Sequence, residues 1–208
     1  MLTLSAGAVN AWGFLSLGGV FTSVVTANSA LIGVGLGGAD PTLGGLAAVA
    51  VLCYVLGAAG AGWVAGHAQR GGRPHGAGFL LLELLLLWAV VGWWLAADGD
   101  PAGGQRTAML GTVAAAMGCQ NGGVRVAMGA QMPTAYLTGL LTGFVTDAVT
   151  DRRVQWRVLV TPTLLILGAA AATLLERLLP HAAPLLPALL VTAAWLTAHA
   201  RTGARRAP

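Results

Sequence analysis

The chain has 208 residues, of which 56% are hydrophobic and only 9% are charged, and its mean hydropathy is +0.76. A soluble domain has about a quarter of its residues charged, so this composition excludes an ordinary water-soluble protein. The formal net charge is +4, but the arginines are scattered and form no basic stripe of the kind that nucleic-acid binding uses. The sequence therefore predicts a protein of the lipid bilayer with no nucleic-acid partner.

Hydrophobic segments follow one another along the whole chain, and short polar breaks between them hold most of the charges. Their approximate bounds are 2–36, 43–66, 77–97, 107–149, 158–175 and 182–198. A bilayer core of about 30 Å takes about 20 apolar residues to cross as a helix. We therefore expect an all-α polytopic membrane protein with about six transmembrane segments in a single transmembrane domain over 1–208, ending in a basic cytoplasmic tail at 201–208.

The first and fourth segments are longer than one crossing requires. At 1.5 Å per residue they would form helices of about 53 and 65 Å, well beyond one membrane thickness. Each contains residues that disfavour a helix in its interior: Gly18 and Gly19 in the first, and Gly129 and Pro133 in the fourth. We expect each to form a full helix, a non-helical break and a shorter half-helix; the alternative is that either segment crosses twice.

The two long segments also resemble each other. An offset of 111 positions pairs Gly7 with Gly118, Asn10 with Asn121, and Gly18 with Gly129. With the matching order of long, medium and medium segments, this predicts a duplicated three-span unit, repeat one over 1–100 and repeat two over 105–200. An odd number of spans in each unit makes the second copy inverted, an architecture common in secondary transporters.

The arginines predict the orientation of the chain. Counting one crossing per segment places eight on one side: Arg70, Arg73, Arg152, Arg153, Arg157, Arg201, Arg205 and Arg206. Only Arg106 and Arg177 fall on the other side, so both termini are expected to be cytoplasmic. The chain contains arginine but no lysine, and it is rich in Gly and Ala. This composition is typical of a GC-rich bacterial genome. We therefore expect a multi-pass protein of the bacterial cytoplasmic (inner) membrane.

Two stretches of sequence carry a family resemblance: AGAVNAWGFLSLGGVFTSVVTANSALIGVGL and AMGCQNGGVRVAMGAQMPTAYLTGLLT. They resemble the two signatures of the YoaK-like family of small bacterial inner-membrane proteins, a domain-of-unknown-function family, over essentially the whole chain. The residues that match the signatures are Gly7, Asn10, Thr26, Asn28, Gln120, Asn121, Arg125, Thr138 and Gly139. Asn10 stands where the family usually has Asp, and Ala27 where it has Gly. The resemblance implies fold and localisation rather than an activity.

Arg125 is the sharpest candidate for a functional residue. A guanidinium within a hydrophobic segment costs at least about 2.5–3.5 kcal/mol unless it faces protein or water. Asn121 lies one helical turn before it, and Gln120 is adjacent, so one interpretation is a polar pocket that binds an anionic or carbonyl-bearing solute. The other is a structural role, as an ion pair or a carbonyl cap, with Glu83 as the candidate partner. Glu83 itself could be a protonatable coupling residue, but pairing with Arg125 is favoured because two lone buried charges would each be costly.

Small and hydroxyl residues recur at helical spacing in several segments. Thr134, Thr138, Thr142 and Thr146 could line a solute path, but such stripes more often join membrane helices. The ladders Ala114-Gly118-Gly122 and Gly62-Gly66 are interpreted in the same way. Such faces also make a homodimer a candidate assembly.

No motif in the sequence indicates an enzyme, a cofactor or a metal site. The histidines lie in loops or at segment ends without metal-ligand spacing, and there is no nucleophile motif or phosphate-binding loop. We therefore expect a transporter or permeation protein for a small polar or anionic solute, with its site at the two broken helices. The expected substrate-binding residues are Asn10, Thr26, Asn28, Gln120, Asn121, Arg125 and Thr138. The alternative is a non-transporting membrane scaffold or assembly partner.

Overall fold

The computed structural model describes residues 1–70, 78–128, 137–151 and 155–204, and these ranges contain helices and no strand. The helices are α1 (Leu2–Ser16), α2 (Val25–Leu36), α3 (Pro41–Arg70), α4 (Gly78–Ala96), α5 (Gly103–Met128), α6 (Leu137–Thr150), α7 (Val160–Leu178) and α8 (Leu185–Ala204). Two short 3₁₀ turns, η1 (Trp156–Leu159) and η2 (Pro180–Ala182), precede α7 and α8. The predicted all-α class is confirmed.

Four helical stretches are long and apolar enough to cross a membrane: Pro41–Ala68, Gly78–Ala96, Trp156–Leu178 and Pro180–Ala200. They correspond to α3, α4, α7 with η1, and α8 with η2, as expected for a membrane protein. α5 is 26 residues long but rich in Gly, Ala and polar residues, and its middle is almost entirely buried. α1 has only 15 residues. The finer prediction of six crossings in two inverted halves stays a prediction.

The expected interruption of the first hydrophobic segment is confirmed. α1 ends at Ser16, α2 begins at Val25, and between them Gly18 and Gly19 have φ values of 116° and 75°. Only glycine adopts this left-handed region without steric cost, so these two residues allow the chain to leave the helix. The fourth segment is likewise divided into α5 and α6. Its expected break, with Gly129, Pro133 and Thr134, lies outside the described residues.

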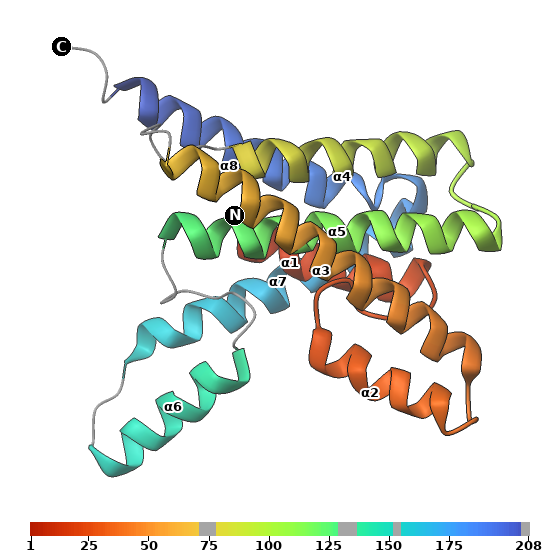
Figure 1. Ribbon diagram of the computed structural model, residues 1–208, viewed down its shortest axis with the longest axis horizontal. Helices are drawn as coiled ribbons and strands as arrows, with labels where there is room; N and C mark the ends of the chain where they lie inside the picture. Colours follow the sequence, from red (N-terminus) through yellow and green to blue (C-terminus); the bar gives the residue numbers. More distant parts are fainter. Residues whose placement is uncertain (71–77, 129–136, 152–154, 205–208) are drawn as a thin grey trace.

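α4 and α5 lie side by side along the long axis of the molecule, whereas α3 and α7 run obliquely to it, and α2 and α6 diverge from this body at its lower side (Figure 1). α2 packs along α3, but α6 has no buried residue. The described members of the threonine stripe, Thr138, Thr142 and Thr146, are all exposed. The described part of the stripe is therefore open at the surface of the chain, and its favoured interpretation as a helix-joining face stays a prediction.

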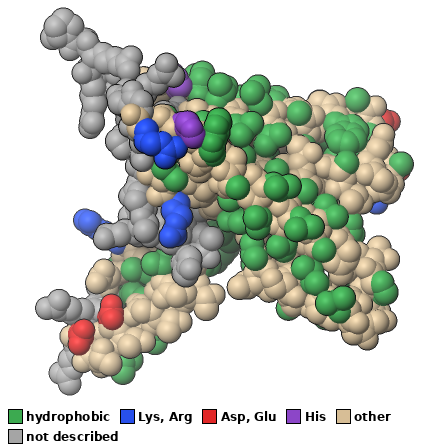
Figure 2. Space-filling view, viewed as in Figure 1, with side chains coloured by type: hydrophobic (Ala, Val, Ile, Leu, Met, Phe, Trp, Pro, Cys, Tyr) green, Lys and Arg blue, Asp and Glu red, His purple; other side chains and the backbone are tan. Residues whose placement is uncertain are grey.

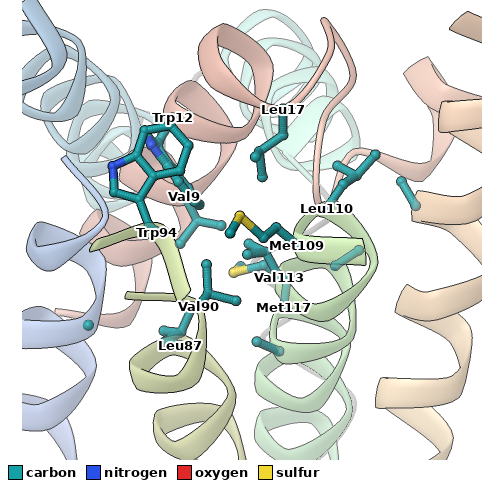
Figure 3. Close-up of a cluster of buried hydrophobic side chains, with 14 of the residues drawn as sticks. Val9, Trp12, Leu17, Leu87, Val90, Trp94, Met109, Leu110, Val113 and Met117 are labelled. Carbon is teal, nitrogen blue, oxygen red and sulfur yellow. The ribbon is translucent and has the colours of Figure 1, made fainter. Parts of the chain in front are cut away.

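The largest core cluster joins α1, α4 and α5 (Figure 3). Trp12 of α1 meets Trp94 of α4 edge to face, with ring centroids 5.3 Å apart. Met109 and Val113 of α5 lie beneath the two rings, near Val9 (Figure 3). In a bilayer, lipid tails are as apolar as these side chains, so close packing rather than removal from water stabilises such a cluster. The cluster fixes the end of α1 beside the start of α5.

Glycine allows α3 and α5 to approach backbone to backbone. A Cβ atom built on Gly118 would lie 2.0 Å from the carbonyl oxygen of Tyr54, and one on Gly57 would lie 2.0 Å from that of Ala115. Real Cβ atoms essentially never come closer than 3.0 Å to such atoms. Close approach of this kind is the usual role of small residues in membrane helices.

The two predicted small-residue ladders have different outcomes. The ladder on α5 is confirmed, because Gly118 packs on α3 and a Cβ on Gly122 would lie 2.5 Å from the carbonyl oxygen of Ala58. The ladder on α3 makes no close contact among the described residues, so its role in joining helices stays a prediction. Within these residues a Cβ on Gly62 would meet nothing within 4 Å, and one on Gly66 would meet only the Arg70 side chain of its own helix.

Charged side chains gather at the ends of the bundle. Basic and histidine side chains cluster at one end of the visible face, and hydrophobic side chains cover its middle (Figure 2). The last turn of α3 holds His67 and Arg70, and Arg125 lies in the last turn of α5. At the other end of the bundle Arg106 pairs with Asp100. This distribution agrees with the predicted separation of the arginines; which end faces the cytoplasm stays a prediction.

Candidate functional site

The break between α1 and α2 is built around Asn10. The side-chain oxygen of Asn10 accepts hydrogen bonds from the backbone N–H of Thr22 (3.1 Å) and Ser23 (3.0 Å), and from the Thr22 hydroxyl (3.1 Å). Its amide nitrogen donates to the carbonyl oxygen of Ala6 (2.8 Å) and to the Ser23 hydroxyl (2.7 Å). The side chain is 7% exposed, and these bonds use its full hydrogen-bonding capacity. Asn10 therefore satisfies backbone groups that the interruption of the helix leaves without partners.

Asn28 secures the same break from the side of α2. Its side-chain oxygen accepts from the backbone N–H of Phe21 (3.1 Å), and its amide nitrogen donates to the carbonyl oxygen of Phe21 (2.5 Å). Asn28 is buried, whereas Thr26 is exposed on α2 and lies outside this network. Two of the three residues expected to bind solute at the first break therefore hold its backbone in place.

The residues expected around the second break do not converge. Gln120 is fully buried, and its amide nitrogen donates to the carbonyl oxygen of Leu2 at 3.5 Å. Asn121 shares a side-chain hydrogen bond with Tyr54. Arg125 is exposed at the end of α5, and Thr138 is exposed on α6.

The two halves of the predicted site lie far apart. Gln120 is level with Leu2, and α1 and α5 run in opposite directions, since the end of α1 packs beside the start of α5. Asn10 is eight residues beyond Leu2 and Arg125 is five beyond Gln120. At 1.5 Å per residue they lie about 12 Å and about 7.5 Å from that level in opposite directions. One solute-sized pocket cannot contact both.

Glu83 of α4 occupies the interior without an ionic partner. Its exposed fraction is 0%, and neither carboxyl oxygen has a hydrogen-bond partner among the described residues. Arg125, the expected partner, is exposed, and the two side chains form no ion pair. The favoured pairing is therefore not formed, because Arg125 lies in the last turn of α5, where its side chain reaches the surface of the bundle.

The position of Glu83 follows from the antiparallel packing of α4 on α5. A Cβ on Gly123 of α5 would lie 2.1 Å from Phe79 of α4, so one turn further along α4 Glu83 faces the turn of α5 that holds Cys119 and Gln120. Glu83 and Cys119 are close enough to interact electrostatically. The Cys119 thiol donates to the carbonyl oxygen of Gly57 (3.4 Å).

Other buried polar atoms without partners lie at or near this level. The side-chain oxygen of Gln120 and the indole N–H of Trp195 make no hydrogen bond to a described residue. Trp195, on α8, packs against the apolar cluster that contains Phe79 and Cys119. We call Glu83, Cys119, Gln120 and Trp195 the interior polar layer. The sequence indicated Glu83 and Gln120, and it gave no signal for Trp195 or Cys119.

The described residues form no group of ligands for a metal ion. Among the residues that the structure describes, no three His, Cys, Asp or Glu side chains lie close enough together to hold an ion. Both cysteines are free thiols. The interior polar layer offers acceptor oxygens from two helices and an indole donor from a third.

These features define a helical membrane protein with a buried polar layer between packed helices. The chain belongs to the family described as "Protein of unknown function (DUF1275)", whose model matches residues 1–197. This confirms the expected membership of a domain-of-unknown-function family. No curated protein and no solved structure matches the chain.

Proposed function

We propose that the protein is a small-solute membrane transporter built from two inverted halves, residues 1–100 and 105–200, that cross the membrane six times. The observation that carries this proposal is the buried and unpartnered carboxyl group of Glu83, at the junction of the two halves. Ionisable residues within membrane-spanning segments are costly, and they mark functional sites by default.

The duplication is supported by a contact that occurs twice. α5 packs on α3, and α1 packs on α7, so the first helix of each half packs against a long helix of the other. A Cβ on Gly7 would lie 2.1 Å from the carbonyl oxygen of Leu165, and one on Gly168 would lie 2.0 Å from that of Leu4. Every residue in these contacts has a counterpart 111 positions away in the α3–α5 contact: Leu4 and Ala115, Gly7 and Gly118, Tyr54 and Leu165, Gly57 and Gly168.

An internal repeat with three crossings in each half has its second copy inverted in the membrane. In this arrangement α1, α3 and α4 are the crossings of the first half, and α5, α7 and α8 those of the second. Transporters with inverted repeats bind solute near the bilayer midplane, where the repeats meet. α4 of the first half packs on α5 and α8 of the second, and this junction contains the interior polar layer. The layer replaces the two helix breaks as the proposed binding site.

The chemistry of the layer restricts the solute. The carboxyl of Glu83 and the amide oxygen of Gln120 present acceptor atoms without partners. The amino terminus of Met1, next to Leu2, belongs to an exposed residue and forms no ion pair with Glu83. A small polar solute that donates hydrogen bonds fits these acceptors better than an anion does. Arg125, exposed at the end of α5, is better placed to attract anionic groups at the membrane surface.

The proposal includes the cellular setting. We place the protein in the bacterial cytoplasmic membrane with both termini cytoplasmic, because the positive-inside rule puts the arginine-rich end of the bundle there. The likeness to the YoaK-like proteins belongs to the same proposal, since it rests on the two signature segments. A homodimer is also part of it, because the small-residue face of α3 at Gly62 is open within the chain.

A non-transporting scaffold is the second candidate. It is favoured by the hydrogen bonding of Asn10 and Asn28, whose side chains serve the backbone of the break. Polar residues that only hold helices together require no solute. The two candidates differ in what the interior polar layer does.

Reconstitution into liposomes distinguishes them. Proteoliposomes containing the full chain are screened for uptake of labelled neutral, cationic and anionic solutes, with protein-free liposomes as the blank. We expect uptake of at least one polar solute, its loss in Gln120→Leu, and its retention in Thr112→Ala, which changes a residue of the same helix whose hydroxyl bonds only within the helix. If the folded protein moves none of these solutes, or if Gln120→Leu moves them at the wild-type rate, the transporter proposal fails and the scaffold remains.

A further inference from the structure

Glu83 lies among side chains from several helices. α4 packs on α5, on α8 and, over a smaller area, on α3. Leu80 and Leu87, one turn before and one turn after Glu83, are both buried apolar residues. The carboxyl group is therefore separated from bulk water along α4 as well as across it.

The described titratable and charged groups on the surrounding helices form no ion pair with it. On α1, Leu2 packs against the same apolar cluster as Leu80. The amino terminus belongs to the exposed residue Met1 and is not bonded to Glu83. On α5 the nearby group is the Cys119 thiol, which already donates to the carbonyl oxygen of Gly57. On α8 His199 is exposed, and its ring packs on that of Trp195. On α3 the Tyr54 side chain is hydrogen-bonded to Asn121, and His67 and Arg70 bond each other at the end of the helix.

A carboxylate in this place would be a buried charge without a counter-ion among the described residues. Transfer of such a charge out of water is far more costly than transfer of the neutral acid, which can also donate its proton to a nearby acceptor. Gln120 lies on the turn of α5 that Glu83 faces and has a buried side-chain oxygen without a partner, so we assign this oxygen as the acceptor. A bound metal ion is a poorer solution, since hard cations in proteins take about six or more oxygen ligands, and Glu83 and Gln120 offer three.

We propose that Glu83 is the proton-binding site of this protein, neutral while the interior polar layer is closed and able to exchange its proton with water when the layer opens. In the transporter proposed above, Glu83 is the coupling residue, and this role rests on that proposed function. Solute movement and loss or gain of this proton then occur at the same junction between the halves.

Infrared spectroscopy of the purified full chain in lipid tests the proton directly. A neutral carboxylic acid has a carbonyl stretching band that a carboxylate lacks. We expect one such band at neutral pH, its loss in Glu83→Gln, and its retention in Asp98→Asn, which removes a fully exposed carboxyl outside the spans. Glu83→Gln keeps the volume and polarity of the side chain, and its circular dichroism should match that of the wild type.

Deuterium oxide and salt complete the test. Transfer to deuterium oxide should shift the band, which shows that the proton exchanges, and added Na⁺ or K⁺ at constant pH should leave it unchanged. The inference is overturned by a folded protein without the band, by a band that never shifts, or by a band that a metal ion abolishes. These outcomes are independent of solute uptake: a normal band with no flux removes the transporter proposal alone, and flux without the band removes this inference alone.

Discussion

Substitution of Gly57 by alanine tests the packing of α3 on α5. The added methyl carbon would lie 2.0 Å from the carbonyl oxygen of Ala115 and 2.8 Å from its Cα atom. Both are backbone atoms of a buried helix, so neither can move aside by a change of rotamer. Ordinary contact begins near 3.4 Å, so the helices must separate locally by about 1.4 Å, enough to lose much of the dispersion attraction across the contact.

The expected loss of stability follows from these distances. Overpacking of a close-packed interior costs about 1–3 kcal/mol, and a contact between backbones falls at the upper end because neither side can yield. Alanine in place of glycine within a helix returns about 0.5–1 kcal/mol. We therefore expect a net destabilisation of about 2 kcal/mol.

Gly60→Ala is the matched control, because it makes the same change on the same helix at a position with no described atom within 4 Å, on a different face from Gly62. We expect it to be neutral or to stabilise by up to about 1 kcal/mol. The measurement is reversible unfolding by SDS in mixed micelles, followed by circular dichroism. The reasoning is refuted if Gly57→Ala unfolds at the same SDS fraction as Gly60→Ala. Gly168→Ala, the counterpart 111 positions along the chain, should match Gly57→Ala in size.

Three further substitutions test the other parts of the molecule. Asn10→Ala should destabilise the protein by about 1–3 kcal/mol, because it leaves buried donors of the break without acceptors. Asn10→Asp at neutral pH should recover only part of this stability, since a carboxylate cannot donate a hydrogen bond to Ala6. Equal stability of the wild type and both variants in SDS titrations would contradict the network. Arg125→Ala should change unfolding by less than about 0.5 kcal/mol, as expected for an exposed side chain, and a large loss would show that it holds the fold. Glu83→Leu should unfold within about 1 kcal/mol of the wild type, because it removes a buried carboxyl together with the one hydrogen bond that its proton is proposed to make to Gln120, and it should abolish uptake in the liposome screen. A much larger loss of stability would show that Glu83 has a further stabilising partner.

Much of the architecture could be predicted from the sequence because membrane crossing depends on local composition. Apolar runs and polar breaks placed α3, α4, α7 and α8 within a few residues, and excess length together with Gly18 and Gly19 indicated the first break. Family membership was readable from two signature segments. The offset of 111 positions was visible in three residue pairs, and the same offset relates the glycine contacts of α1 with α7 and of α3 with α5.

The site could not be assembled from the sequence, because polarity shows which residues need partners without showing which partners they find. Asn10 and Arg125 are both polar residues in apolar segments, and on that ground both were expected to bind solute. One bonds the backbone of its own break, and the other reaches the surface. Glu83 and Arg125 were paired on charge alone, which ignores that they lie at different depths of the bundle.

The sequence by itself determined that the chain is helical, where its helices run and where the first long segment is interrupted, because these depend on hydrophobicity and backbone preference within a few residues. Only the tertiary structure decided which small residues form contacts. Gly57 and Gly62 are equivalent in the sequence, yet one touches a neighbouring backbone and the other faces open space. It also decided that Glu83 has no counter-ion among the described residues, since the partner of a buried charge depends on the crossing of helices that are distant in the chain.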